Sequence, residues 1–187
     1  GTIIGAFFAI KVEMTQMPQL VAIFNGVGGG ASALVASAEF LKGAEGLFAI
    51  TAITLSVLIG TLTFTGSFIA FGKLQGVVTT KPVTFPGQQV LNALLAIVMF
   101  GCAYMILQNP NDGMNLFYII LGLSGLLGVL LVIPIGGADM PVVISLLNSY
   151  SGIAAAATGF VLQNHALIVS GCLVGASGIF LTNIMCK

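Results

Sequence analysis

The sequence predicts an all-α protein, a polytopic bundle of transmembrane helices with six full spans and one truncated span at its N-terminus. Hydrophobic residues make up 58% of the 187 positions and charged residues only 5%, whereas a soluble domain carries about 25% charged residues. The five basic and five acidic residues are also gathered into short clusters. Between the clusters, apolar runs reach the roughly 20 residues that a helix needs to cross a bilayer. Too little charge remains to cover a water-facing surface, which excludes a soluble fold.

Helix-breaking and polar residues mark the limits of the predicted spans. Residues 1–10 are interpreted as the end of a truncated helix, and six full spans follow at 18–41, 46–72, 88–107, 114–133, 140–162 and 166–186. Pro18 and Pro141 stand in the first turn of their helices, where the N–H that proline lacks would have no helical partner. Asp139 precedes the fifth span and is a candidate N-cap, and residues 109–113 predict a tight turn. We expect residues 1–187 to form one transmembrane domain, a fragment of a longer chain.

The lysines indicate how the bundle is oriented in the membrane. Alternating the connections places Lys11, Lys73, Lys81 and Lys187 on one side and only Lys42 on the other. By the positive-inside rule, the first side faces the cytoplasm, or the matrix in a mitochondrion. The net charge is zero, so no nucleic-acid partner is implied.

Two of the predicted spans are similar to each other. An offset of 123 residues lays residues 17–36 over residues 140–159 with six identical pairs, among them Asn25 with Asn148. Chance or shared packing of small residues explains the match as well as a true repeat does. A true repeat would be parallel, because both helices start on the same side of the membrane. In that case we expect the two helices to pack as equivalents around one site.

Three of the spans carry small and polar residues at i, i+3 and i+4 spacing, which places them on one helix face. The three stripes are Ala22, Asn25, Gly29, Ser32 and Ala36; Ser56, Gly60, Thr63 and Ser67; and Ser145, Asn148, Gly152, Ala155 and Gly159. Polar residues in a membrane usually face the bundle interior or a water-filled path. Two interpretations stay open. One is close helix packing, with amide hydrogen bonds of roughly 0.6–2 kcal/mol each. The other is a hydrophilic path along Asn25, Ser145, Asn148 and Ser149.

Two glycine patterns need separate interpretation. Residues 26–31 fit the dinucleotide-binding pattern G-x-G-x-x-A, and Glu45 follows at about the right distance. No strand precedes these glycines, so the pattern indicates a closely packed membrane helix instead of a nucleotide site. Gly171, Gly175 and Gly178 form a small-residue face on the last span. That face indicates either tight packing or a mobile helix that passes motion to whatever follows the chain.

Titratable and reactive side chains are few. No carboxylate or lysine lies deep in a predicted span, since Glu39 is already in the last turn of its helix, and His165 is expected in a surface loop. The cysteines at 102, 172 and 186 lack metal-ligand spacing and are expected to be inert thiols. No catalytic set, P-loop or metal site is visible. The residues alone therefore leave two functions, a transporter or ion-path subunit and a structural membrane anchor. A proton path would need a titrating group from a helix outside this sequence.

Longer strings run through the whole chain and carry a resemblance to a known family. They are VEMTQMPQLVAIFNGVGGG, TGSFIAFGKLQG, IGGADMPVVISLLNSYSG, GCLVGASG and IMCK. These strings resemble the proton-translocating NAD(P) transhydrogenases, and they are closest to the mitochondrial form. The resemblance covers essentially the whole chain and matches the membrane domain that adjoins the NADP(H)-binding domain. It implies that residues 1–187 form the proton-translocating domain.

The resemblance implies hydride transfer from NADH to NADP, driven by inward proton flow. NAD(H) and NADP(H) would bind to soluble domains outside this chain, on the lysine-rich side of the membrane. The implied partners are those two domains, the remaining transmembrane helices, the lipid bilayer and a second copy in a homodimer. The implied location is the mitochondrial inner membrane, with a bacterial plasma membrane as the alternative. The alternative functions are a helical-repeat secondary transporter and a structural membrane-anchor subunit.

The resemblance also assigns roles to individual residues. By matching position, Asp139 and Asn148 correspond to family residues implicated in proton translocation and its coupling. The glycine face of the helix that leads to the NADP(H) domain corresponds to Gly171, Gly175 and Gly178. Some bacterial members have a membrane histidine where this chain has Asn25. We therefore expect Asn25 to form hydrogen bonds or to position water, and His165 does not match that histidine.

Overall fold

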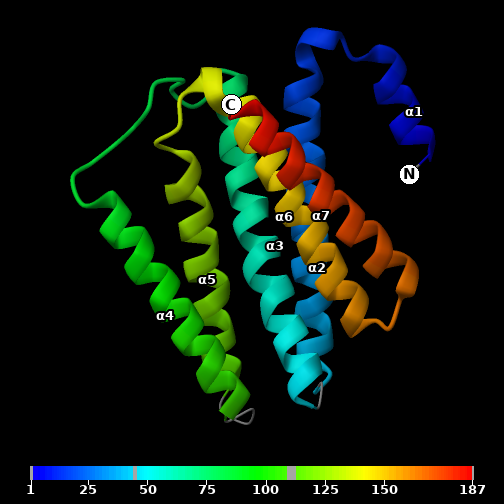
Figure 1. The fold of residues 1–187 in the computed structure, drawn as a ribbon, viewed down its shortest axis with the longest axis vertical. Helices are drawn as coiled ribbons and strands as arrows, with labels where there is room; N and C mark the ends of the chain where they lie inside the picture. Colours follow the sequence, from blue (N-terminus) through cyan, green and yellow to red (C-terminus); the bar gives the residue numbers. More distant parts are fainter. Residues whose placement is uncertain (1, 44–45, 109–112, 187) are drawn as a thin grey trace.

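The computed structural model describes residues 2–43, 46–108 and 113–186, and every regular element in these ranges is a helix (Figure 1). Two short 3₁₀ turns, Met14–Gln16 and Gly137–Asp139, lead into the second and sixth helices. The α-helices in these ranges are α1 (Thr2–Lys11), α2 (Met17–Leu41), α3 (Leu47–Leu74), α4 (Gln88–Gln108), α5 (Gly113–Val132), α6 (Met140–Val161) and α7 (His165–Met185).

Six helices in the described part of the chain, α2 to α7, are long and apolar enough to cross a membrane, judged by length and composition. They agree with the predicted spans to within two residues at each end. The predicted truncated span corresponds to α1, which has 10 residues. The all-α membrane bundle is therefore confirmed. The predicted turn at 109–113 lies almost wholly outside the described residues, and so do Glu45 and Lys187.

The helix limits follow from local chemistry. Pro18 and Pro141 stand in the first turn of α2 and α6, as predicted. Gly43 and Gly76 follow the ends of α2 and α3 with φ angles of 81° and 72°. This left-handed conformation is one that glycine adopts without steric cost, and it commonly ends a helix.

α3 is the central helix of the bundle. It packs against α2, α5 and α6 and touches α4 lightly, whereas α4 packs mainly on α5 and α7 on α6. In Figure 1, α4 and α5 lie on one side of α3, and α2, α6 and α7 lie on the other. α1 stands apart from this bundle in the same view. α3 therefore joins the two halves of the bundle.

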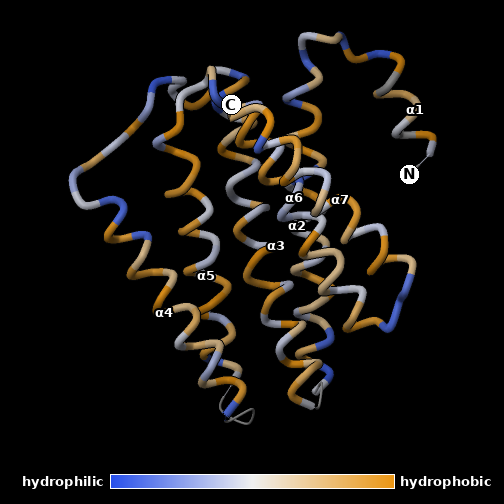
Figure 2. Tube along the Cα trace, viewed as in Figure 1, coloured by the Kyte–Doolittle hydropathy of each residue, from blue (hydrophilic) through white to orange (hydrophobic). Residues whose placement is uncertain are grey.

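The connections alternate between the two ends of the bundle. The connections after α1, α3 and α5 and the end of α7 lie at one end in Figure 1. This end carries Lys11, Lys73 and Lys81, while Lys42 follows α2 at the opposite end. Hydrophilic residues gather at the connections, and apolar residues dominate the helices between them (Figure 2). The alternation thus agrees with the predicted grouping of these lysines, while the side of the membrane that each end faces stays a prediction.

Lys73 and His165 occupy positions that differ from the predicted ones. Lys73 was expected just beyond the second full span, but α3 continues to Leu74 and buries the Lys73 side chain completely. His165 was expected in a loop, but it is the first residue of α7, with its side chain exposed as expected. The helix begins there because the Asn164 side chain accepts a hydrogen bond of 3.2 Å from the Leu167 N–H, which is an N-cap.

Small residues bring α3 close to its neighbours. A Cβ atom on Gly29 of α2 would lie 2.8 Å from the Gly60 carbonyl oxygen and 2.9 Å from Thr63 Cβ. On the α5 side, the Thr65 hydroxyl donates to the Gly125 carbonyl at 2.9 Å. Lipid tails are as apolar as leucine, so helices in a bilayer associate through such close packing and interhelical hydrogen bonds.

The contrast between two adjacent glycines tests this packing. We expect Gly29→Ala to lower the stability of the protein by about 1–3 kcal/mol, because the new methyl group overpacks the α2–α3 contact. Gly28→Ala is the matched control, since a Cβ atom there meets nothing within 4 Å. The measurement is the temperature at which the detergent-purified protein loses its monodisperse peak. An equal loss in both variants would contradict the packing described here.

Candidate functional site

The candidate residues on α6 lie on two faces of the helix, one toward α7 and one toward α2. Ser145 and Ser149 face α7, where their hydroxyls donate to the Gly178 carbonyl at 3.3 Å and to the Gly175 carbonyl at 2.6 Å. Both serines are buried, and Ser149 is wholly inaccessible. The buried residues of α7 are Gly171, Gly175 and Gly178. The predicted glycine face is therefore the surface of α7 that contacts α6.

The main chains of α6 and α7 are almost in contact at this face. A Cβ atom on Gly171 would lie 2.5 Å from the Ala156 nitrogen, and one on Gly152 would lie 2.5 Å from the Gly175 nitrogen. A Cβ atom on Gly178 would lie 2.8 Å from Ser149 Cβ. This geometry supports the tight-packing interpretation of the glycine face. Helices that approach at this distance have no side chains between them to absorb a displacement.

Asn25 is a residue of α2, and its side chain faces α6. Its side chain is 6% exposed, and its Nδ2 donates to the Ile144 carbonyl of α6 at 3.1 Å. The Ser151 hydroxyl of α6 donates back to the Asn25 carbonyl at 2.9 Å. These two bonds tie the helices that the internal repeat aligns, and both helices start at the same end of the bundle (Figure 1). Asn25 therefore has the hydrogen-bonding position that was expected for it.

Asn148 lies one turn beyond Ile144 on α6 and one turn before Ser151, so it shares their face. The side chain is only partly buried. It forms no hydrogen bond to any other residue that the structure describes, in contrast to Asn25. An amide at this depth in a bilayer needs a partner, because an unsatisfied polar group in hydrocarbon is costly. The partner must therefore come from water or from protein outside the described residues.

A buried hydroxyl cluster joins α2, α3 and α6. The hydroxyls of Ser56 and Thr158 share a hydrogen bond of 2.6 Å, and they are 0% and 3% exposed. Both also reach the Ser32 carbonyl, at 3.3 Å and 3.4 Å, and the Ala154 carbonyl, at 3.2 Å and 3.0 Å. The polar stripes of α2 and α3 therefore meet α6 here.

Two residues that bond across the α2–α6 contact, Thr158 and Ser151, were not predicted as site residues. Thr158 falls opposite Val35 in the internal alignment, so the repeat gave it no weight. Ser151 lies three residues after Asn148, and this helical spacing could have placed it on the same face. Both reach backbone carbonyls of α2, at Ser32 and Asn25, and no sequence pattern identifies such partners.

The stripes of α2 and α3 face each other. The buried members are Ala22, Asn25, Gly29, Ser32 and Ala36 on α2 and Ser56, Gly60, Thr63 and Ser67 on α3. A Cβ atom on Gly26 would lie 3.2 Å from Ser67 Cβ. The Ser67 hydroxyl is fully buried and has no hydrogen-bond partner among the described residues. A hydroxyl can donate and accept at once, so Ser67 leaves one unused donor inside the bundle.

Asp139 occupies the position before α6 but does not cap the helix with its side chain. The 3₁₀ turn Gly137–Asp139 leads directly into Met140, and the Asp139 carboxylate accepts no cap hydrogen bond. The side chain is exposed at the end of the bundle that carries Lys73 and Lys81. The predicted N-cap position is therefore correct, while the hydrogen bond that would make it a cap is absent from the structure.

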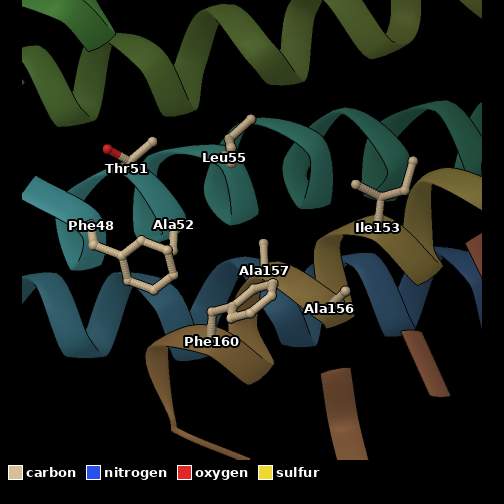
Figure 3. A pocket seen from close by; sticks show the side chains of 8 residues that line it. All are labelled: Phe48, Thr51, Ala52, Leu55, Ile153, Ala156, Ala157 and Phe160. Carbon is tan, nitrogen blue, oxygen red and sulfur yellow. The ribbon is translucent and has the colours of Figure 1, made fainter. Parts of the chain in front are cut away.

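The cavities beside the bundle interior differ in polarity. A cavity of about 290 Å³ lies between α3 and α6, and Figure 3 shows the side chains that line it. They are Phe48, Thr51, Ala52, Leu55, Ile153, Ala156, Ala157 and Phe160. Apart from the Thr51 hydroxyl, this lining offers nothing to hydrogen-bond water or a proton. A cavity of about 220 Å³ among α2, α6 and α7 has two hydroxyls in its lining, those of Ser151 and Ser170.

Among the described residues, the interior holds one direct hydroxyl–hydroxyl bond, between Ser56 and Thr158, and few groups that can hold a proton. The buried polar side chains that the structure describes are amides, hydroxyls and one lysine, Lys73, with no carboxylate or histidine among them. Hydroxyls and amides with ordinary proton affinities do not titrate near neutral pH. The arrangement fits a relay whose titrating group stands on another helix. Cys102, Cys172 and Cys186 are free thiols.

The three glycines of α7 should respond differently to the same substitution. We expect Gly171→Ala and Gly178→Ala to lower stability by about 1–3 kcal/mol each, because the new methyl groups meet α6 main-chain atoms within 2.5 Å and 2.9 Å. Gly175→Ala is the internal control, since its nearest neighbour, Ile153 Cγ1, is 3.2 Å away and can shift. Thermal unfolding in detergent gives the ranking. A larger loss for Gly175→Ala than for Gly171→Ala would contradict the described helix crossing.

Comparison with known proteins agrees with the resemblance of the longer strings. A family model described as NAD(P) transhydrogenase beta subunit matches residues 1–187. Two curated NAD(P) transhydrogenase subunit beta sequences from Rhodospirillum rubrum are each 47% identical to this chain over 196 residues. The alignments cover 100% of this chain and 42% of each relative, so the chain spans less than half of their length. Because the family model matches its whole length, the chain belongs to the NAD(P) transhydrogenase beta subunit family.

Proposed function

We propose that this chain is the proton-translocating membrane domain of an NAD(P) transhydrogenase. In the intact protein it would couple inward proton movement to hydride transfer from NADH to NADP. The observation that carries this proposal is the 47% identity, over the whole chain, to relatives named NAD(P) transhydrogenase subunit beta. Six helices able to cross a membrane and a hydrogen-bonded polar interior support it.

The proposal assigns both nucleotides to parts of the protein outside this chain. NAD(H) and NADP(H) would bind to soluble domains at the lysine-rich end, which would face the matrix or the cytoplasm. The further partners would be the remaining transmembrane helices, the surrounding lipid and a second copy in a homodimer. The membrane would be the mitochondrial inner membrane or, as the alternative, a bacterial plasma membrane. The relatives' greater length supports this division, because it leaves room for such domains.

The proton would pass along α6. Asn148 would accept a bond from a titrating group on a helix outside this chain, since its amide has no partner in the described residues. Asn25, Ser145 and Ser149 would fix the surrounding helices by the bonds described above. The hydroxyl of Ser151 lies on the same face. In this assignment Asn25, Ser145, Asn148 and Ser149 would each form hydrogen bonds, and none of these side chains would carry a charge.

Coupling would follow from the contact between α6 and α7. A protonation event near Asn148 that displaces α6 would also displace α7, because their main chains touch at Gly152 and Gly171. α7 ends at the end of the bundle where α6 begins (Figure 1), and Asp139 directly precedes α6. The two would change together how the NADP(H) domain docks. One charge that crosses 100 mV releases about 2.3 kcal/mol, enough to change a binding equilibrium more than tenfold.

Asn148→Leu in the intact protein tests the path. The substitution keeps the approximate size of the side chain and removes its hydrogen bonds. We expect the number of protons moved per hydride to fall at least about fivefold. A fivefold change corresponds to the low end of typical coupling free energies. The measurement is the pH change inside sealed vesicles during turnover, compared with nucleotide absorbance. Ser177→Leu is the control, because Ser177 is exposed on α7 and bonds only to its own helix.

Two outcomes of that assay are decisive. A wild-type protein that transfers hydride without changing the internal pH would reject the proposed function. A fully coupled Asn148→Leu variant beside a pumping wild type would reject the path and leave the function standing.

Asp139→Asn separates charge from helix capping. Asparagine can cap a helix as well as aspartate does, and the Asp139 side chain makes no cap bond here. We therefore expect unchanged thermal stability and coupled turnover reduced about tenfold, within the usual range of coupling energies. Stability is measured by thermal unfolding and coupling by the vesicle assay. A variant with full coupled activity would leave Asp139 with a structural role only.

A further inference from the structure

Lys73 is buried at the lysine-rich end of the bundle. It stands in the last turn of α3, and its side chain is 0% exposed. Its Nζ donates to the Ile133 carbonyl at 2.5 Å, to the Ile135 carbonyl at 2.8 Å and to the Lys81 carbonyl at 3.4 Å. An ammonium group has three donors, so this set of acceptors satisfies it fully.

This arrangement is not the usual behaviour of a lysine near the end of a membrane helix. Such lysines extend along the helix and place the ammonium group in the aqueous interface. Lys73 turns inward, although burial of a charge is costly unless hydrogen bonds compensate for it. The ion pair that the structure records within the described ranges joins Lys42 and Glu39 instead. The compensation at Lys73 comes from carbonyls, including those just after the negative end of α5.

The acceptors belong to two separate connections. Ile133 and Ile135 lie in the α5–α6 connector, residues 133–139, and Lys81 lies in the α3–α4 loop, residues 75–87. Backbone bonds also join the two segments, from the Gly137 N–H to the Thr80 carbonyl at 2.9 Å and from the Val83 N–H to the Ile133 carbonyl at 3.3 Å. Lys73 thus holds both segments to the central helix.

We infer that Lys73 is a positioning residue whose buried ammonium group fixes the α5–α6 connector, and with it Asp139, relative to α3. Asp139 is the last residue of this connector and begins α6 without a cap bond of its own. Its position is therefore determined by what holds the connector. The Lys73 clamp, defined as the Lys73 ammonium group with the Ile133, Ile135 and Lys81 carbonyls, is the part of that hold that comes from α3, and the two backbone bonds to the α3–α4 loop complete it.

The clamp has a functional consequence that rests on the proposed function. α3 contacts α2, α5 and α6, so a shift of α6 relative to α3 must strain or move the connector. With the clamp intact, Asp139 moves only in step with the helices. Without it, Asp139 and the start of α6 move independently, and proton movement no longer sets the docking of the NADP(H) domain. Loss of the clamp should therefore reduce coupling more than hydride transfer.

Three variants of the full-length enzyme separate the clamp from general packing. Lys73→Met keeps an unbranched apolar stem and removes the ammonium group. Lys73→Arg keeps a charge and donors for the same carbonyls. Lys81→Met is the matched control, because it removes a neighbouring charge on an exposed side chain and leaves the Lys81 carbonyl in place.

Amide hydrogen exchange on the intact protein measures the hold directly. We expect exchange in residues 133–139 and at Val83 to become roughly tenfold faster in Lys73→Met, because local opening there loses a charged hydrogen-bond set. Lys73→Arg should restore at least part of the protection, and Lys81→Met should match the wild type. If Lys73→Met does not assemble, Lys73→Gln takes its place, since its amide keeps two donors without the charge. Unchanged exchange in the charge-free variant would overturn the inference.

The second readout is the number of protons moved per hydride in sealed vesicles. The expected result is a ratio at least about fivefold lower in Lys73→Met, partly restored in Lys73→Arg and unchanged in Lys81→Met. Faster exchange with an unchanged ratio would overturn the coupling role, because a merely structural residue would give that result. A wild-type enzyme that moves no protons rejects the proposed function instead, and the exchange experiment then still decides whether the clamp exists.

Discussion

No hydrophobic force drives one apolar helix against another inside a bilayer, so this bundle depends on how closely its main chains can approach. The approach is made at glycines, between α2 and α3 at Gly29 and Gly60 and between α6 and α7 at Gly152 and Gly171. Serine and threonine then bond to carbonyls of the neighbouring helix, as Ser149 does to Gly175. Close packing and interior polarity therefore depend on each other, because the glycines bring the helices near enough for hydroxyls such as that of Ser149 to reach carbonyls of the next helix.

This dependence reconciles the two interpretations of the polar stripes. Ser56 and Thr158 lie within hydrogen-bond distance of each other and of carbonyls of α2 and α6, which is what close packing requires. A hydroxyl pair of this kind can pass a proton from one oxygen to the other, since each can donate and accept. Asn148 differs from them because it has no partner within the described residues. Close packing accounts for the hydrogen bonds of most of the polar interior. It does not account for Asn148, whose amide has no partner within the described residues.

The fold could be predicted from the sequence almost completely, because a bilayer demands long apolar helices and leaves few alternatives. The helix faces also followed from spacing alone, as Asn25 and Gly29 show by being buried where expected. Partners could not be predicted in the same way. Lys73 finds acceptors 60 residues away at Ile133, and the three similar glycines of α7 meet different atoms. Such contacts depend on helix rotation and depth, which periodicity does not determine.

The central and peripheral helices of this chain are unequal in how much of their surface is enclosed. In the apolar 18-residue stretch of α3, 56% of the residues are buried by the rest of the chain. The corresponding share in α4 is 11%. Within this chain, a residue of α3 must match a neighbour in volume and shape, whereas most residues of α4 need only be soluble in hydrocarbon. The helices of this chain therefore place no packing constraint on exchanges among isoleucine, leucine, valine and phenylalanine along the outer surface of α4. At the buried positions of α3, even the exchange of one methyl group changes the packing against a neighbouring helix.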